Sequence, residues 1–155
     1  MAENIEQRLR RMGIELPEVA APAANYLPFV QSGNLLMTSG QLPLQQGKLV
    51  ATGLLGRDLD TAAGQAAARI CAINVLAAVK AALGELEQIR RTVKITVFVA
   101  SAPGFAEQHL VANGASDLLA EALGERGRHA RSAVGVAMLP LNAPVEVEAI
   151  IETRN

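Results

Sequence analysis

The chain has 155 residues, half of them hydrophobic, with three Phe, one Tyr and no Trp. This length fits one compact domain whose core is built from small aliphatic side chains. Fourteen basic and fifteen acidic side chains leave a net charge of −1, which offers no field for attracting nucleic acid or anionic lipid. A single cysteine, Cys71, excludes an internal disulfide and a cysteine cluster for a metal.

The N-terminal part of the sequence predicts a short helix and a hairpin. Residues 4–12 place apolar side chains at helical spacing, and Gly13 ends this helix. An extended connector to residue 24 follows, and strands over 27–32 and 34–39 are joined by a tight turn. A further short strand is predicted at 48–51.

The remainder of the chain predicts two long helices and three strands. The helices run over 60–83 and 105–123, and a glycine ends each of them. Strict alternation of apolar and polar residues predicts a strand at 92–99, and two more strands follow at 131–138 and 145–152. The pattern indicates a single α+β domain, a mixed sheet with both long helices on one face.

The last two strands predict what lies on each face of that sheet. Ser132, Val134 and Val136 share one side of their strand, and we expect this side to lie under the helices. Arg131, Ala133 and Gly135 then share the uncovered side with the glutamates of the final strand. This uncovered side meets either solvent or another subunit, and both remain open.

Few side chains are candidates for chemistry. Arg131 stands beside small residues that leave room for a bound carboxylate, although an exposed arginine in a surface ion pair would have the same surroundings. Glu146 and Glu148 project to one face about 7 Å apart, and could either act as acid and base on water or be solvated polar positions. His109, expected on a helix surface, and His129, expected in a loop, lack the spacing of metal ligands, so no metal site is expected.

Three segments resemble the reactive-intermediate deaminase (Rid, YjgF-like) family. They are the opening hairpin with Thr38-Ser-Gly-Gln-Leu-Pro43, the strand Val93–Val99, and Ala130-Arg-Ser-Ala-Val-Gly-Val-Ala-Met-Leu-Pro140 followed by Val145-Glu-Val-Glu-Ala-Ile150. The resemblance covers residues 25–155, and residues 1–24 are similar to the added N-terminal helix and connector of some longer relatives. It implies a chorismate-mutase-like (bacillus-type) fold and a homotrimer that buries the uncovered sheet face and forms three clefts between subunits.

The activity that the resemblance implies is hydrolysis of reactive 2-imino acids and their enamine forms, such as 2-iminopropanoate or 2-iminobutanoate, to 2-oxo acids and ammonia. No metal or organic cofactor is implied. Arg131 matches the arginine that holds the substrate carboxylate, and Glu146 matches the carboxylate that positions the attacking water. Gly40 matches the glycine whose backbone lies against the ligand, and Asn113 matches an asparagine of the cleft.

Two positions depart from the family pattern and leave the substrate preference open. Phe29 stands where many relatives have a tyrosine, and Ala133 stands where many have a cysteine. A non-catalytic or regulatory protein that binds a small carboxylate in the same cleft is the alternative. Endoribonuclease, a label of some relatives, would require a basic groove with stacking aromatics, and the charge and the few aromatic residues argue against it.

The location and partners follow from the same observations. The N-terminal segment has no continuous apolar stretch of the kind found in a signal peptide. The longest apolar stretch is interrupted by Lys80, and we expect it to be too short to span a bilayer. We therefore expect a cytoplasmic protein that binds neither nucleic acid nor membrane, and the resemblance implies a homotrimer that binds a small imino acid.

Overall fold

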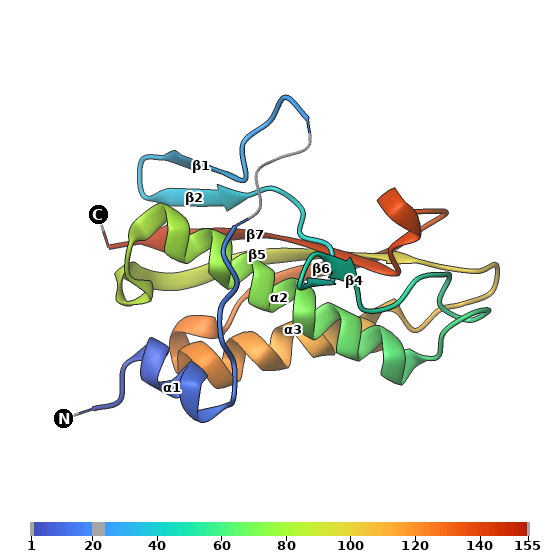
Figure 1. The fold of residues 1–155 in the computed structure, drawn as a ribbon, viewed down its shortest axis with the longest axis horizontal. Coiled ribbons are helices and arrows are strands. Elements are labelled where there is room, and N and C mark those ends of the chain that lie inside the picture. Colours follow the sequence, from blue (N-terminus) through green and yellow to red (C-terminus); the bar gives the residue numbers. More distant parts are fainter. Residues whose placement is uncertain (1, 20–23, 155) are drawn as a thin grey trace.

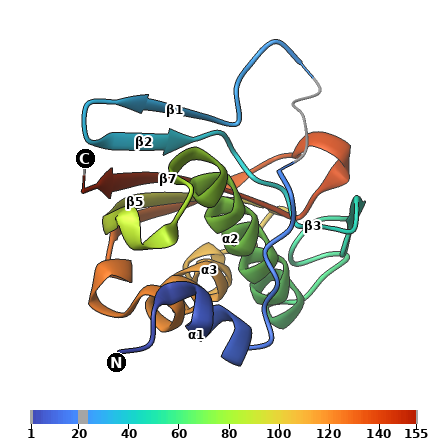
Figure 2. The same cartoon turned by 60° about the vertical axis from the view of Figure 1, so that its left-hand side comes forward.

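A five-stranded mixed sheet, covered on one face by two long helices, forms the body of the protein in the computed structural model, which describes residues 2–19 and 24–154 (Figures 1 and 2). The strand order is β1-β2-β7-β5-β6, and only the β5–β6 pair is parallel. The strands of this sheet are β1 (Phe29–Ser32), β2 (Leu35–Thr38), β5 (Ile89–Ala100), β6 (Ala130–Val136) and β7 (Val145–Thr153). A separate hairpin is formed by β3 (Leu44–Gln45) and β4 (Lys48–Leu49). The α+β class predicted from the sequence is confirmed.

The helices begin and end where the sequence places their signals. Helix α2 (Thr61–Leu83) begins after Asp60, whose side chain accepts a hydrogen bond from the backbone N–H of Ala63 at 2.8 Å. It ends at Gly84, whose φ of 81° suits glycine. Helix α3 (Gln108–Leu123) begins three residues later than predicted. The short 3₁₀ helices are η1 (Leu86–Gln88), η2 (Gly124–Gly127) and η3 (Pro140–Asn142).

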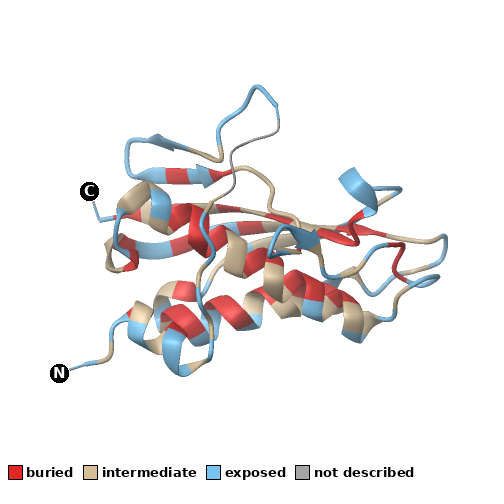
Figure 3. Ribbon diagram, viewed as in Figure 1, coloured by how far each residue is buried: buried red, intermediate tan, exposed pale blue. Residues whose placement is uncertain are grey.

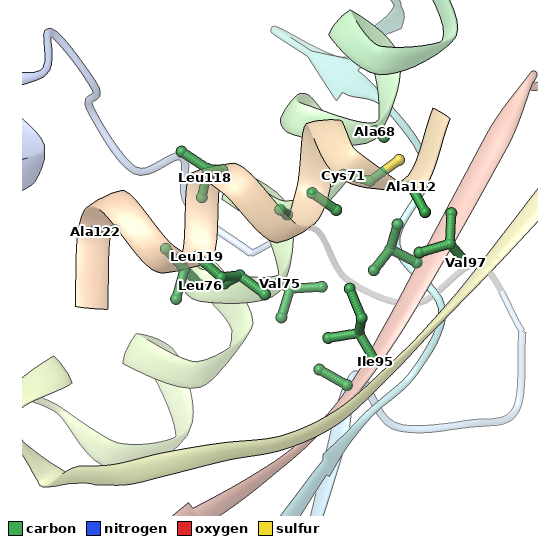
Figure 4. Packing of buried hydrophobic residues seen from close by; sticks show 14 of the residues in the cluster. Ala68, Cys71, Val75, Leu76, Ile95, Val97, Ala112, Leu118, Leu119 and Ala122 are labelled. Atoms are coloured by element: carbon green, nitrogen blue, oxygen red, sulfur yellow. The ribbon is translucent and has the colours of Figure 1, made fainter. Parts of the chain in front are cut away.

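The core lies between the sheet and the pair α2–α3 (Figures 3 and 4). Many of its side chains are small, so the two helices approach each other closely. A Cβ on Gly114 of α3 would overlap the backbone carbonyl of Gln65 in α2, which makes glycine necessary at that crossing. Cys71 is fully buried in this core and its thiol lies 3.6 Å from the carbonyl oxygen of Val145. Burial raises the pKa of this thiol well above its ordinary value, so Cys71 is a packing residue.

Helix α2 is also the one helix of the described residues that is long and apolar enough to cross a membrane, which corrects the expectation that every apolar stretch is too short. By length and composition the 23 residues suffice, because the helix carries only two charged side chains, Arg69 and Lys80. Core packing accounts for this composition, since the helix buries one side against the sheet and another against α3 (Figure 4).

The predicted N-terminal helix is confirmed as α1 (Ile5–Arg11) and is joined to the domain core. Asn4 caps it, and Ile5 and Leu9 are buried in the same hydrophobic cluster as the sheet and long helices. The backbone N–H of Ile5 donates to Glu87 at 2.8 Å, and Arg8 donates to the carbonyl of Ala122 at 3.1 Å. These contacts fix α1 against η1 and the end of α3.

The faces of β6 are opposite to the prediction. Arg131 and Ala133 pair with the buried Ile95 and Val97 of β5, so they lie on the helix side, whereas Val134 is 42% exposed on the other side. The reason is that β6, the edge strand, passes close beneath α3. Small residues therefore stand under the helix and the larger apolar ones face away. In β7 the glutamates do lie on the uncovered face, as predicted.

Candidate functional site

Arg131 is held in place by three neutral acceptors on helix α3. Its Nη1 donates to Oδ1 of Asn113 at 2.8 Å and to Oγ of Ser116 at 3.0 Å, and its Nη2 donates to the carbonyl of His109 at 2.9 Å. The three acceptors follow one another at helical spacing, so one face of α3 presents them together. The guanidinium, half-buried beside β6, is therefore fixed in orientation.

The guanidinium keeps both its charge and one edge for a ligand. Within residues 2–19 and 24–154, no carboxylate lies within ion-pair distance of Arg131 and no acceptor contacts its Nε. Five N–H donors are available and three are used, which leaves the Nε–H and one Nη2–H. Those two donors form the edge that binds a carboxylate through two parallel hydrogen bonds. Asn113 also keeps its amide N–H₂ as a donor, because its oxygen faces the arginine.

Two further residues support Arg131 and were missed in the sequence. Ser116 Oγ lies 2.9 Å from Nε2 of His129, and Nδ1 of the same ring lies 2.6 Å from the carbonyl oxygen of Gly127. His129 lies in a loop between η2 and β6, as expected, and is half-buried there, two residues before Arg131. In the sequence, the three-residue spacing of Asn113 and Ser116 on one helix face was the one signal that both could contact Arg131. The contact between Ser116 and His129 carries no such signal, because it depends on the path of η2 along α3.

A second group of predicted residues lies on the other side of the sheet. The signature loop after β2 is bonded to β7 through a bridge between Gln41 and Val147, and this places Gly40 against Glu146. A Cβ on residue 40 would overlap the Glu146 carboxylate, so glycine is necessary for this contact. Asn74 of α2 holds the loop from below by donating to the carbonyl oxygens of Leu42 at 2.9 Å and Leu44 at 3.0 Å.

The carboxyl group of Glu146 has altered acidity. Partial burial raises its pKa above the ordinary value, and the neighbouring Glu148 on the same face raises it further. A glutamate whose neutral and charged forms are closer in free energy at neutral pH exchanges a proton with water more readily. Glu146 is thus suited to hold or pass a proton.

Within one chain the two groups remain apart. Arg131 faces α3 from β6, while Glu146 points from β7 to the uncovered face, with β5 between the two strands. Two strand spacings alone separate them by about 10 Å, and they point in opposite directions. Phe29 lies on β1, at the far edge of the sheet, and packs against the core beside the buried Thr38. Ala133 is adjacent to Arg131 on the helix side of β6.

Other features of the described residues offer no competing centre. No group of three or more His, Cys, Asp or Glu side chains there could hold a metal ion. A cavity of about 530 Å³ beside α1 is lined in part by Glu6, Arg10 and Lys80. None of the predicted site residues lines this cavity, and two of its charged side chains, Glu6 and Lys80, already form an ion pair at 3.4 Å. We therefore place the candidate site at the two groups above.

Comparison with known proteins gives one consistent result. A family model described as "YjgF/chorismate_mutase-like, putative endoribonuclease" matches residues 6–152. The protein TCP17 of Trypanosoma cruzi is 53% identical over 153 residues, which are 98% of this chain and 96% of that protein. The crystal structure of Atu1372 from Agrobacterium tumefaciens is 61% identical with a TM-score of 0.91, covering 96% of this chain and 92% of that one. E. coli TdcF, solved with bound serine, is 29% identical with a TM-score of 0.60, covering 90% and 93%. The chain belongs to the YjgF/chorismate-mutase-like (Rid) family.

Proposed function

We propose that the protein hydrolyses reactive 2-imino acids to 2-oxo acids and ammonia in a site formed between two copies of the chain. The observation that carries this proposal is the guanidinium of Arg131, which is fixed by neutral acceptors and keeps a free bidentate edge. Such a group suits a small ligand with a carboxylate, and every 2-imino acid has one. Bound serine in TdcF, a family relative, is an amino acid of similar size with the same carboxylate.

Arg131 would orient the substrate. Two parallel hydrogen bonds from Nε and Nη2 fix the plane of the carboxylate, and with it the adjacent imine carbon. Because the anchors on α3 are already in place, little ordering of the side chain is required when the substrate binds. The amide N–H₂ of Asn113 offers a further donor close to the same ligand.

Glu146 would position the water and move the proton. As a carboxylate it accepts a hydrogen bond from water, whose oxygen then forms a bond to the imine carbon while the C=N double bond becomes a single bond. The carboxylate takes one proton from this water and passes it to the nitrogen, which gives a carbinolamine. It then transfers the hydroxyl proton to the same nitrogen, so the C–N bond breaks, ammonia leaves and the C=O bond forms. Its raised pKa favours this exchange near neutral pH. Gly40, in contact with the carboxylate, keeps space for the ligand beside its backbone.

A homotrimer would bring the two groups together. Arg131 belongs to the β6 edge of the sheet and Glu146 to the uncovered face, so a second copy whose uncovered face meets this β6 edge would complete the cleft. The uncovered sheet face also supports association, because Val30 is 52% exposed there and Val134 is 42% exposed. Contact between two different surfaces of the chain is heterologous, and it closes into a ring when the rotations between successive copies add up to a full turn.

The endoribonuclease activity in the family description has less support in this chain. The net charge is −1, and RNA binding relies on basic grooves with aromatic rings for stacking. A carboxylate-binding protein without catalysis would use the same arginine, so turnover must be measured directly.

The test is a coupled assay in which an amino-acid oxidase or threonine dehydratase generates the imine and semicarbazide traps what survives. Wild type should lower the trapped signal, and Arg131→Ala and Glu146→Gln should each lose most of this effect. Several parent amino acids would define the preference that Phe29 and Ala133 set. Absence of acceleration for every imine, with a folded wild-type protein that still binds 2-oxo acids, would reject catalysis in favour of binding. Equal activity of Arg131→Ala and wild type would reject the proposed role of the arginine.

A further inference from the structure

A chain of hydrogen bonds runs from Arg131 to the backbone of η2. Arg131 Nη1 lies 3.0 Å from Ser116 Oγ, Ser116 Oγ lies 2.9 Å from His129 Nε2, and His129 Nδ1 lies 2.6 Å from the carbonyl oxygen of Gly127. Ser116, His129 and Arg131 are half-buried, and Gly127 is buried.

The carbonyl of Gly127 and the guanidinium of Arg131 fix the direction of the two outer bonds, and the middle bond takes its direction from the neutral form of His129. The carbonyl of Gly127 only accepts, so Nδ1 of His129 carries the hydrogen. In the neutral ring Nε2 is then the acceptor, and the hydroxyl of Ser116 must donate to it. The oxygen of Ser116 is left to accept from Arg131, which only donates. A serine hydroxyl alone rotates freely, and the histidine removes that freedom.

The far end of the chain is fixed by packing. A Cβ on Gly127 would overlap the backbone carbonyl of Leu119, so this glycine allows η2 to lie directly on α3. The helix that supplies Ser116 therefore also determines where the Gly127 carbonyl lies. His129 connects this carbonyl to the start of β6, two residues before the arginine.

The neutrality of these partners matters for anion binding. An aspartate or glutamate in place of Ser116 would hold the guanidinium equally well but would cancel its charge. Serine holds the guanidinium through an uncharged hydroxyl and leaves the charge for a ligand.

We propose that His129 is a positioning residue that acts through Ser116 to fix the guanidinium of Arg131 for binding a carboxylate. The carboxylate as ligand rests on the proposed function, whereas the fixing of the guanidinium does not. His129 itself need not touch the substrate.

The first measurement is of the guanidinium itself, by ¹⁵N NMR of the Arg131 side chain in the full-length protein. Slow rotation, with resolved Nη signals, is expected for wild type. Ser116→Ala and His129→Phe should both average these signals, and Ser116→Thr, which keeps the hydroxyl, should restore them. Arg128→Gln is the matched control, because Arg128 adjoins His129 but pairs only with the exposed Glu125. Thermal melts confirm that each variant is folded.

The second measurement is the affinity for 2-oxobutanoate, a non-reacting carboxylate, by calorimetry, together with KM and kcat for imine turnover. Loss of one anchoring hydrogen bond should raise Kd and KM about 3- to 10-fold, with kcat changed much less. Adding His129→Phe to Ser116→Ala should have no further effect, because His129 reaches Arg131 only through Ser116. A role limited to stability would lower the melting temperature and leave KM unchanged.

The outcomes separate this inference from the proposed function. Unchanged Arg131 signals in both single variants, or a full additional loss in the double variant, would overturn the positioning role even if imines are hydrolysed. Averaged signals and weaker 2-oxobutanoate binding, in a wild-type protein without imine turnover, would support the positioning role while rejecting the proposed activity.

Discussion

Mixing two inactive variants tests whether the site is shared between copies of the chain. Arg131 and Glu146 lie on opposite faces of one sheet with β5 between their strands, so the proposed site would take the arginine from one copy and the glutamate from a neighbour. Arg131→Ala and Glu146→Gln, co-expressed in equal amounts with different tags, should therefore recover activity that neither has alone. In a random ring, half of the first copies keep the arginine and half of their neighbours keep the glutamate, so about one quarter of the sites are intact.

The matched control uses the same two substitutions on one chain. Arg131→Ala/Glu146→Gln mixed equally with wild type should again give about one quarter of the sites intact, against about one half if each chain held its own complete site. Activity is followed in the unfractionated mixture as loss of the semicarbazide-trapped imine, and the two tags confirm that mixed species have formed. No recovery in the first mixture, together with one half in the control, would refute the shared site and the geometry on which it rests.

Three further predictions concern acidity and close contacts. Glu146 has a raised pKa in the folded protein, so its ionisation destabilises the fold as pH rises through that pKa. Glu146→Gln should therefore raise the melting temperature by a few degrees at pH 8 and change it little at pH 4. The absence of this pH dependence would count against the burial argument. Glu87 has a lowered pKa, chiefly because the backbone N–H of Ile5 donates to it. Its contribution to the free energy of unfolding is therefore present above the unfolded-state pKa and disappears as pH falls. Glu87→Gln should lower the free energy of unfolding by about 1 kcal/mol at pH 7 and by almost nothing at pH 3, measured by chemical unfolding. Gly40→Ala should reduce imine turnover at least tenfold, because the new methyl group displaces the Glu146 carboxylate. The control is Gly33→Ala, where a Cβ has open space but φ is +60°; this change should lower stability and leave kcat unchanged.

Local sequence signals predicted the elements of this fold well. Asp60 and Gly84 mark the ends of α2, and the alternation at 92–99 belongs to the longer strand β5. These features depend on neighbours in the chain, which a sequence displays directly. The arrangement of the two hairpin strands followed from the tight turn at Gly33, whose φ is +60°.

The faces of β6 could not be predicted in the same way. Hydrophobicity assigned Val134 to the helix side, but the space under α3 admits only small side chains, and that space is a property of helix placement. The partners of Arg131 were hidden for the same reason. Asn113 was indicated by family resemblance alone, and the contact between Ser116 and His129 depends on the turn made by η2. Neither composition nor residue spacing predicts the contact of Arg131 with Asn113 or that of Ser116 with His129.

The sheet has two different free edges, β1 and β6, in addition to its exposed apolar face. An edge that pairs with a different edge can add copies without limit unless each step turns by a fixed fraction of a circle. The twist of the sheet therefore decides between a closed ring and a filament, and a substitution that flattens β1 or β6 would favour fibres. An unassembled copy leaves both edges unpaired, so its measured stability should rise with protein concentration.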